Sequence, residues 1–580
     1  MACPQIPSPL ASRAPPRSPY KDTPSMPRRA RPLRPLPLPA HPSVPVGQAA
    51  ALDTALDQTL VRSLGALPLL WPLCDQLGLR DLVNRRCYPD GTVPEDIDLG
   101  RIVVILVLNR LLAPQPLVHV ERWLAGTMLP ELLGLSAAQC NDDRLARTLD
   151  TVLPHLDALW QDLIVAAVTR FDLDLRALCY DLTSLSFCGA YEEADLIRYG
   201  YSRDHRPDQK QVELATTVTA AGGVPLDYRV LAGNVADRTT PVENLRRLRG
   251  LLAQLPPRDP TQPAPVVVSD RAMLTLEALA AYAEADLHPL GPLDPSLGDG
   301  AVRDLLAAVP AAELAAAPLA YRPRRAVDDP EWEDYHGVER PLALPHPDPS
   351  QPSLDIRALV VWSPGKARLD AQLRATHLTR LEDALADLAG KVGRRPYTTT
   401  EAVQKRVRTL LARHPARRFV TVAGGTEDAA PLHLTWVRQE EALAAAATLD
   451  GRYVLGTTAP EPDAAEILRL AKQRDVPEKR FALVKGPLAV RPLFVHKEGR
   501  VLGVVWATMV ALLLFALLEL QVRQAGLSAS GQTVLAWAAP LAVVLLLLPD
   551  GTTLCRLANL GPPVADLLRR LGWPAPECYC

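Results

Sequence analysis

The order of hydrophobic patterns between residues 176 and 286 restricts the fold of this chain to a mixed α/β sheet. Residues 176–187, RALCYDLTSLSF, are rich in aromatic and β-branched side chains and predict a strand. Residues 211–234 predict two strands joined at Ala-Gly-Gly, which is a hairpin signal. An amphipathic helix over 242–255, a wholly apolar strand over 264–270 and a second helix over 273–286 follow. Strands and helices in this order are typical of a mixed sheet covered by helices.

Changes of pattern on either side of this region divide the 580 residues into five parts. The residues before it repeat apolar side chains at helical spacing, and the first fifty are rich in Pro and Arg with almost no core-forming pattern. Several candidate strands and one long helix follow it. We expect a disordered basic arm at 1–50, a helical N-terminal domain at 51–170, the first part of the core at 171–294, a β-rich insertion at 295–460 and a helical C-terminal part at 461–580.

Charge is unevenly distributed along a chain whose formal net charge is only -2. Residues 1–50 hold seven Lys and Arg against one acid, residues 391–418 nine against one, and residues 465–500 nine against four. Local basic segments of this kind can follow the phosphates of a nucleic acid. Each one can equally be an ordinary solvated helix face, so charge alone does not establish a nucleic-acid partner.

The nine cysteines are scattered, and no two have the C-x-x-C spacing of a zinc site. The sequence also lacks H-E-x-x-H, G-x-x-x-x-G-K-[ST] and G-x-S-x-G, and its N-terminus has no continuous apolar stretch resembling a signal peptide. These observations favour a reducing compartment, and we expect the protein to be cytoplasmic.

Two acidic residues lie in or at the end of predicted strands. Asp181 is inside YDLTS, and Asp270 closes VVVSD. Strand ends hold side chains in fixed positions, and carboxylate oxygens are the ligands that hard divalent cations prefer. An Asp at a strand end is more often a cap or turn residue, so neither is assigned a role on this ground alone.

Several motifs in a fixed order add a family resemblance. The segments CYDLTSLSF, YGYSRDHRPD, GNVAD and VVVSDRAML resemble the catalytic core of insertion-sequence DDE transposases, in the group with a β-rich insertion before the catalytic Glu. The resemblance runs from about Leu64 to Leu568. It implies a ribonuclease-H-like mixed sheet as the core of a multidomain α/β protein, with an all-α N-terminal domain and a helical C-terminal tail.

In this family the third acid is a Glu on a helix. It belongs to the motif Y-x(2)-R-x(3)-E-x(6)-K, where each number counts the residues between the named ones. In AKQRDVPEKRFALVK, Arg474, Glu478 and Lys485 have the required spacing. The resemblance implies that Asp181, Asp270 and Glu478 are the catalytic and metal-binding residues, and that Arg474 and Lys485 hold DNA phosphates. If this helix does not touch DNA, the next candidates for the third acid are residues 440, 441 and 466, all Glu.

Three positions depart from the family pattern. Ala471 replaces the Tyr of the helix motif, and Ala272 replaces a Gly that usually follows the second Asp-Arg. Pro477 precedes Glu478, and proline is poor inside a helix but acceptable in its first turn. Either the helix begins at about Asp475 or it is kinked there.

The resemblance implies a reaction in two steps on DNA. Two Mg²⁺ (or Mn²⁺) ions ~3.5–4 Å apart would activate water and then a 3′-hydroxyl for in-line attack on phosphorus. The partners would be terminal inverted repeats and target DNA. We expect a dimer on the DNA, no membrane, and a nucleoid-associated location in the cytoplasm.

Two alternatives from other classes remain open. One is a decayed or repurposed transposase that binds DNA without cutting it, which Ala471 and Pro477 favour. The other is a membrane protein with a C-terminal helical hairpin, because Val501 to Leu518 is eighteen residues without a charge. A helix that is apolar on all sides can also be buried in a protein core.

Overall fold

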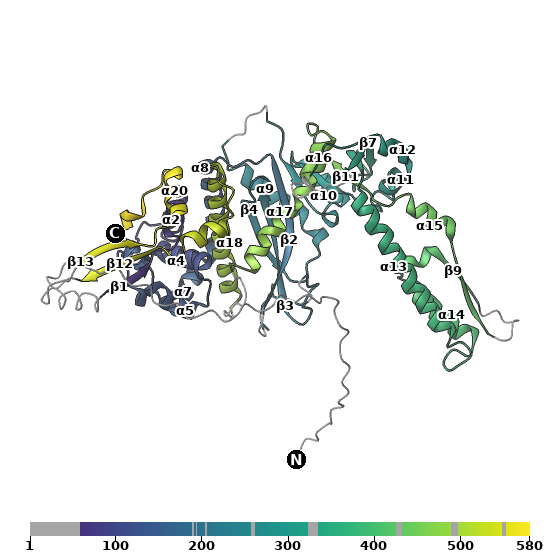
Figure 1. The fold of residues 1–580 in the computed structure, drawn as a ribbon, viewed down its shortest axis with the longest axis horizontal. Coiled ribbons are helices and arrows are strands. Elements are labelled where there is room, and N and C mark those ends of the chain that lie inside the picture. The colour runs from purple at the N-terminus through teal and green to yellow at the C-terminus, as the bar shows by residue number, and fades with distance from the viewer. Residues whose placement is uncertain are drawn as a thin grey trace, which may run out of the picture. The chain divides into compact units, whose positions relative to one another are not determined.

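The computed structural model describes residues 59–579 except 188–190, 193, 204–205, 257–261, 323–333, 425–431, 489–496 and 548–552. The predicted basic arm at 1–50 lies outside these residues. What is described is a multidomain α/β structure, with one large mixed sheet and many helices (Figure 1).

The large sheet has eight strands in the order β4-β3-β2-β5-β6-β11-β8-β7. Its first five strands in chain order are β2 (Ala177–Phe187), β3 (Lys210–Thr219), β4 (Pro225–Ala232), β5 (Val266–Val268) and β6 (His288–Pro292). Strands β2, β3 and β4 are antiparallel neighbours, whereas β5 and β6 run parallel to β2. The predicted mixed sheet is therefore confirmed.

Local chemistry explains these strands and their connections. The β3–β4 turn contains Gly222 and Gly223 at φ of 100° and 63°, a backbone region that side chains rarely adopt. Strand β5 is three buried valines, as expected for a strand covered on both faces. Helix α9 (Pro241–Leu252) connects β4 to β5, and α10 (Leu276–Glu284) connects β5 to β6. The long connection through α10 is what the parallel neighbours β5 and β6 require.

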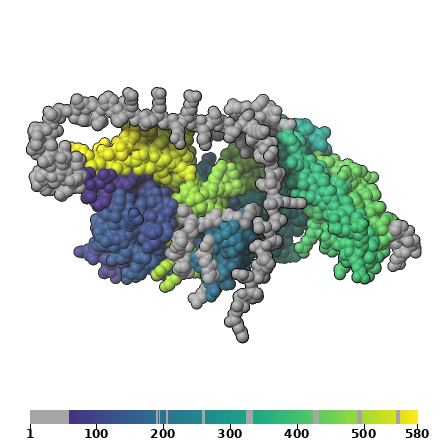
Figure 2. Space-filling model, turned by 60° about the horizontal axis from the view of Figure 1, so that its bottom comes forward, coloured from purple at the N-terminus to yellow at the C-terminus, as the bar shows by residue number. Residues whose placement is uncertain are grey.

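The N-terminal part is mainly helical, and its elements pack against the C-terminal end of the chain (Figures 1 and 2). Its longer helices are α2 (Leu67–Leu77), α3 (Leu79–Cys87), α4 (Leu99–Leu112), α7 (Asp142–Val152) and α8 (Leu156–Phe171). The N-cap of α4 is the buried Asp98, whose side chain accepts from the Arg101 amide and from Arg80. Strand β1 (Leu60–Ser63) pairs with β12 (Ala542–Leu547), so this part is not purely α.

Helix α18 (Glu498–Gln524) contains the apolar run noted in the sequence. It contacts α2, α4 and α7 and also reaches β4 and α17 (Asp475–Lys485), so helices bury it more than the sheet does. Among the described residues, α18 is the one single helix that is long and apolar enough to cross a membrane. The helices α4 and α5 (Leu117–Ala125) would make a second candidate span if they are taken together, although they are bent by 89° relative to one another. Because 94% of its apolar window is buried within the structure, α18 also has the character of a core helix.

The segment expected to be a β-rich insertion contains more helix than strand in its described residues. Strands β7 (His336–Leu344), β8 (Leu354–Trp362) and β11 (Arg452–Thr457) extend the large sheet beyond β6. The helix α13 (Pro364–Ala389) alone runs for 26 residues, and α14 (Thr400–Leu411) follows it. A separate antiparallel pair is formed by β9 (Val420–Gly424) and β10 (Leu434–Arg438). Helices α13 and α14 consist largely of Ala, Leu, Arg, Lys, Gln and Glu, which all have high helix propensity.

The expectation of a purely helical C-terminal part is also corrected. The apolar run after residue 534 divides at Pro540, which cannot continue the helix α19 (Gly531–Ala538). The residues beyond it form β12, which pairs with β1 in a three-stranded sheet completed by β13 (Thr553–Ala558). Cys555 in β13 is disulfide-bonded, although the scattered cysteines favoured a reducing compartment.

Candidate active site

Two of the predicted acids lie side by side because their strands are parallel neighbours. Cys179 of β2 is level with Val268 of β5. Asp181 lies two residues further along β2, and Asp270 lies two residues beyond the end of β5, so both acids follow this pair in the same direction. The register of the sheet thus brings together two residues separated by 88 others in the chain.

The third predicted acid approaches from a helix that packs on the same strands. Helix α17 contacts β2 and β3 and begins at Asp475. Pro477 is buried in its first turn, where proline costs no hydrogen bond. Glu478 follows it and is exposed. The structure therefore has a helix start at this point rather than a kink.

The electrostatics of Asp181 show that the three acids share one neighbourhood. The pKa of Asp181 is raised to about 7, mainly by burial, and the nearby carboxylates of Asp270 and Glu478 contribute to the rise. The Leu182 amide, which donates to Asp181 at 2.7 Å, and the Arg203 guanidinium oppose this shift. A half-buried carboxylate beside two others would be stabilised further by a bound cation.

The donor chemistry fits a hard divalent cation, since all three groups offer carboxylate oxygens. Within the described part of the chain, however, no three His, Cys, Asp or Glu side chains are close enough together to share one ion as they stand. Asp181 is the fixed member, and Asp270 and Glu478 are exposed side chains that can turn toward it.

Arg474 and Lys485 lie at opposite ends of α17. Arg474 is not on the helix with Glu478 but in the 3₁₀ turn before it, and its Nη1 donates to Asp270 Oδ1 at 3.2 Å. Lys485, the last residue of α17, lies close enough to lower the pKa of Glu213 on β3, which burial raises. The two basic residues thus flank the acids, Arg474 on the β5 side and Lys485 on the β3 side.

An ion-pair network that was not predicted from the sequence ties the remaining motifs together. Arg203 donates to both oxygens of Asp237 at 2.7 Å and to Glu213 at 3.3 Å. Ser184 of β2 donates to the same Glu213 at 2.9 Å. The motifs GYSRDHRPD and GNVAD supply Arg203 and Asp237. The presence of both motifs in the sequence indicated that these segments belong to one site, but it did not show which of their residues pair.

The positions that depart from the family pattern also have clear environments. Ala471 is buried in an apolar cluster and also lines the cleft beside Asp270. Ala272 is exposed beside Asp270 and lines a cleft there. Of the alternative third acids, Glu466 pairs with Arg469, whereas Glu478 is among the groups that act on the pKa of Asp181.

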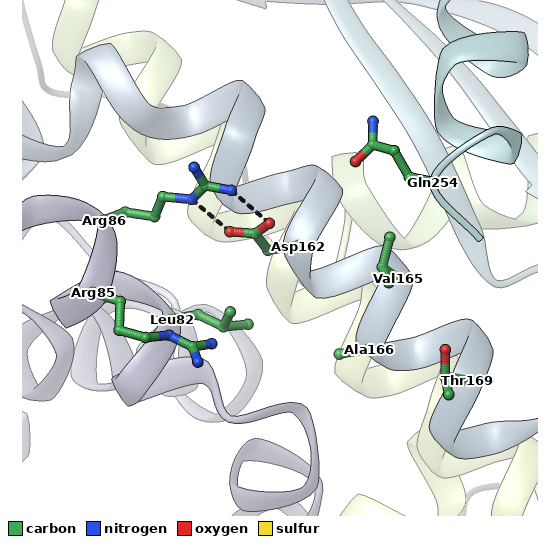
Figure 3. A pocket seen from close by; sticks show the side chains of 8 residues that line it. All are labelled: Leu82, Arg85, Arg86, Asp162, Val165, Ala166, Thr169 and Gln254. Carbon is green, nitrogen blue, oxygen red and sulfur yellow. Dashed lines mark hydrogen bonds and ion pairs between the residues drawn. The ribbon is translucent and has the colours of Figure 1, made fainter. Parts of the chain in front are cut away.

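Two hollows of similar size differ in their chemistry. One, of about 690 Å³, lies between α3, α8 and Gln254; there Arg86 binds both oxygens of Asp162, and none of the five predicted site residues lines it (Figure 3). The other, of about 520 Å³, contains Asp270 and Arg474 in its wall. We place the candidate active site at the second.

Two comparisons with known proteins found a match, one for the N-terminal helices and one for most of the chain. Residues 59–165 match the family model described as a domain of unknown function, DUF4277. No curated protein matches the chain. Among solved structures, the chain is similar to a piggyBac transposase synaptic complex with hairpin DNA, with 9% identity over 80% of this chain and 78% of that chain. The TM-score of 0.37 is too low for this likeness to establish fold or function.

Proposed function

We propose that this chain is a DNA transposase of the DDE class, which cuts the ends of an element and joins them to target DNA. The observation that supports the proposal most is that Asp270 and Glu478, from two other segments of the chain, lie near enough to Asp181 to raise its pKa. In-line phosphoryl transfer by two divalent ions needs carboxylates from rigid elements at one point.

We further propose that the core is ribonuclease-H-like. Its support is topological: an antiparallel β2-β3-β4 meander is followed by helix, parallel strand, helix and parallel strand, in the spatial order β4-β3-β2-β5-β6. The resemblance in the sequence implies the same core. In this proposal β11, β8 and β7 are additions from the inserted segment that widen the sheet.

Each residue of the site has a proposed part in the reaction. Asp181, Asp270 and Glu478 would hold two Mg²⁺ or Mn²⁺ ions, which supply the charge stabilisation for the attacking and leaving oxygens. Asp181 is held by the Leu182 amide and so sets the position of the site. Arg474 would release Asp270 and bind a DNA phosphate, while Lys485 would bind a second phosphate beyond Glu213.

The chain would act on DNA as a dimer, because two element ends must be held together. We also propose that it works in the cytoplasm on the nucleoid and needs no membrane. The burial of α18 by other helices supports the latter point.

A cleavage assay tests this function. The purified full chain is incubated with a duplex carrying its own element's end and with Mg²⁺ or Mn²⁺, and EDTA is the control. We expect a nick that leaves a 3′-hydroxyl and requires the metal. DNA binding without any metal-dependent nick would instead favour the alternative of a transposase-derived binding protein.

A further inference from the structure

Helix α17 carries Glu478 on one face and a buried arginine, Arg480, on the opposite face. Two positions along an α-helix correspond to a rotation of about 200°, so the two side chains point in nearly opposite directions. Glu478 is exposed, whereas Arg480 is only 7% exposed and lies on the buried side of the helix with Pro477, Phe481 and Val484. An arginine is rarely this buried unless its charge is paired. Its partners therefore show what holds α17.

The guanidinium of Arg480 binds the turn between β3 and β4. Its Nε donates to the Gly223 carbonyl at 2.9 Å, and its Nη2 donates to the Gly222 carbonyl. The approach is close, because a Cβ at Gly223 would lie 2.7 Å from the Arg480 Nε and 2.9 Å from Val476 Cγ1. Helix α17 thus packs directly on the backbone of this turn.

The same guanidinium forms a buried ion pair with α18. Its Nη1 lies 2.8 Å from Glu519 Oε2, and the two side chains are 8% and 14% exposed. The other oxygen of Glu519 accepts from the Gly531 amide at 3.0 Å, in the first turn of α19. The centre of the Phe515 ring, also on α18, lies 5.9 Å from the guanidinium carbon. Arg480 therefore joins α17 to the β3–β4 turn and to α18, which packs on the N-terminal helices.

Directional contacts of this kind fix the rotation of a helix about its axis. A buried ion pair adds little net stability, because desolvation of the two charges offsets their attraction. Its hydrogen bonds have good geometry at one orientation only, whereas apolar burial has no preferred direction. A rotation of α17 by about 20° would move the Glu478 carboxylate by ~2 Å, because that group lies ~5–6 Å from the helix axis. A working site needs its groups placed within about 0.5 Å.

We propose that Arg480 is a positioning residue, which holds α17 at the rotation that keeps Glu478 directed toward Asp181. This inference rests on the proposed function. It also gives α18 a part in the site, because the ion pair with Glu519 connects the Glu478 helix to the helical N-terminal part of the chain.

The test uses the double variant Arg480→Met with Glu519→Gln in the full chain. It removes both charges, so that no unpaired charge is left buried, and Met keeps an apolar stem in place of the arginine. We expect a thermal midpoint close to that of wild type. The affinity of the DNA-free protein for Mn²⁺, measured by titration calorimetry, should fall by about tenfold or more, as it does when groups that orient metal ligands are lost. The kcat of strand cleavage should fall as well, with an unchanged KM for DNA.

Arg480→Lys is the conservative variant. It keeps the positive charge opposite Glu519 but loses the fork of donors that also reaches the turn, so its Mn²⁺ affinity should lie between those of wild type and the double variant. Should the double variant not fold, Arg480→Lys alone decides, and an Mn²⁺ affinity equal to that of wild type would then overturn the proposal.

The matched control is Arg500→Gln with Asp150→Asn. It removes another ion pair of α18, at 2.7 Å and about 28 Å further along the helix, and should leave Mn²⁺ affinity unchanged. If the Arg480 double variant loses thermal stability but binds Mn²⁺ and cuts DNA like wild type, Arg480 has only a structural role and the proposed function stands. If wild type itself neither binds Mn²⁺ nor cuts DNA, the proposed function fails and this inference fails with it.

Discussion

The guanidinium of Arg474 donates to the carboxylate of Asp270 at 3.2 Å, across 204 positions of sequence. A positive side chain thus occupies one oxygen of an acid that we propose as a metal ligand. Both side chains are more than half exposed, and such pairs contribute only ~0–1 kcal/mol. The contact is therefore weak enough to be replaced, so that Asp270 binds a metal ion and Arg474 binds a DNA phosphate.

The first prediction concerns this contact. Arg474→Ala should raise the affinity of the DNA-free protein for Mn²⁺ by up to about fivefold, because the metal no longer competes with the guanidinium. Titration calorimetry or Mn²⁺ resonance spectroscopy measures it. Arg469→Ala, which removes the partner of Glu466 one turn earlier, is the matched control and should leave Mn²⁺ affinity unchanged. A lower Mn²⁺ affinity in Arg474→Ala would contradict the competition.

A second prediction addresses the acids themselves. Asp181→Asn, Asp270→Asn and Glu478→Gln should each abolish strand cleavage and leave DNA affinity within about twofold, since an amide keeps the shape but does not bind the ion as a carboxylate does. Gel assays of cleavage and of binding on the same DNA separate the two effects. Near-wild-type cleavage in any one variant would remove that residue from the mechanism.

Local patterns were sufficient to predict the centre of the sheet. The strand containing Asp181, the Ala-Gly-Gly hairpin and the valine strand before Asp270 depend on neighbouring residues and on the spacing of apolar side chains, which the sequence displays directly. Once β2 and β5 are parallel neighbours, the meeting of Asp181 and Asp270 follows from register.

Long-range pairing could not be predicted in the same way. Nothing within Arg452–Thr457 indicates that β11 pairs with β6, because that choice depends on the whole sheet. The pairing of Arg474 with Asp270 rather than with Asp475, and the bridge from Arg203 to Glu213 and Asp237, likewise depend on tertiary placement.

A third prediction follows from the buried carboxyl. Below about pH 3 Asp181 is protonated in both folded and unfolded chains. Between about pH 4 and pH 7 only the unfolded chain ionises it, so this group lowers the free energy of unfolding as pH rises. In the metal-free protein, Asp181→Asn should therefore be more stable than wild type at about pH 8, by on the order of 3 kcal/mol.

Urea unfolding at several pH values measures this difference. The difference in free energy of unfolding between Asp181→Asn and wild type should decrease toward about pH 4. At about pH 8 millimolar Mg²⁺ should also decrease this difference, because the ion stabilises the ionised carboxylate of the wild type. Equal stabilities of the two proteins at about pH 8 without metal would show that Asp181 is not buried as described.

A fourth prediction uses salt. Each neutralised phosphate contributes about -0.9 to the slope of log affinity against log salt, so Lys485→Ala and Arg474→Ala should each reduce the magnitude of the slope by roughly one. Arg570→Ala provides the baseline. Slopes unchanged from wild type in both variants would mean that α17 does not touch DNA, and Glu478 would then lose its place in the site.

The final prediction distinguishes a core helix from a membrane helix. Expressed without detergent, the chain should fractionate as soluble, because α18 is covered by α2, α4 and α7. Ion pairs also connect its two ends to neighbours: Arg500 to Asp150 at 2.7 Å and Glu519 to Arg480 at 2.8 Å.

A substitution on α18 tests the same point. Leu513 is fully buried, so Leu513→Ala should lower the free energy of unfolding by ~2–5 kcal/mol and lower the thermal midpoint. The control Leu369→Ala, at an exposed site on α13, should change the midpoint little. A lipid-facing leucine would tolerate the change. Carbonate-resistant membrane association, together with an unchanged midpoint for Leu513→Ala, would show that α18 lies in a bilayer.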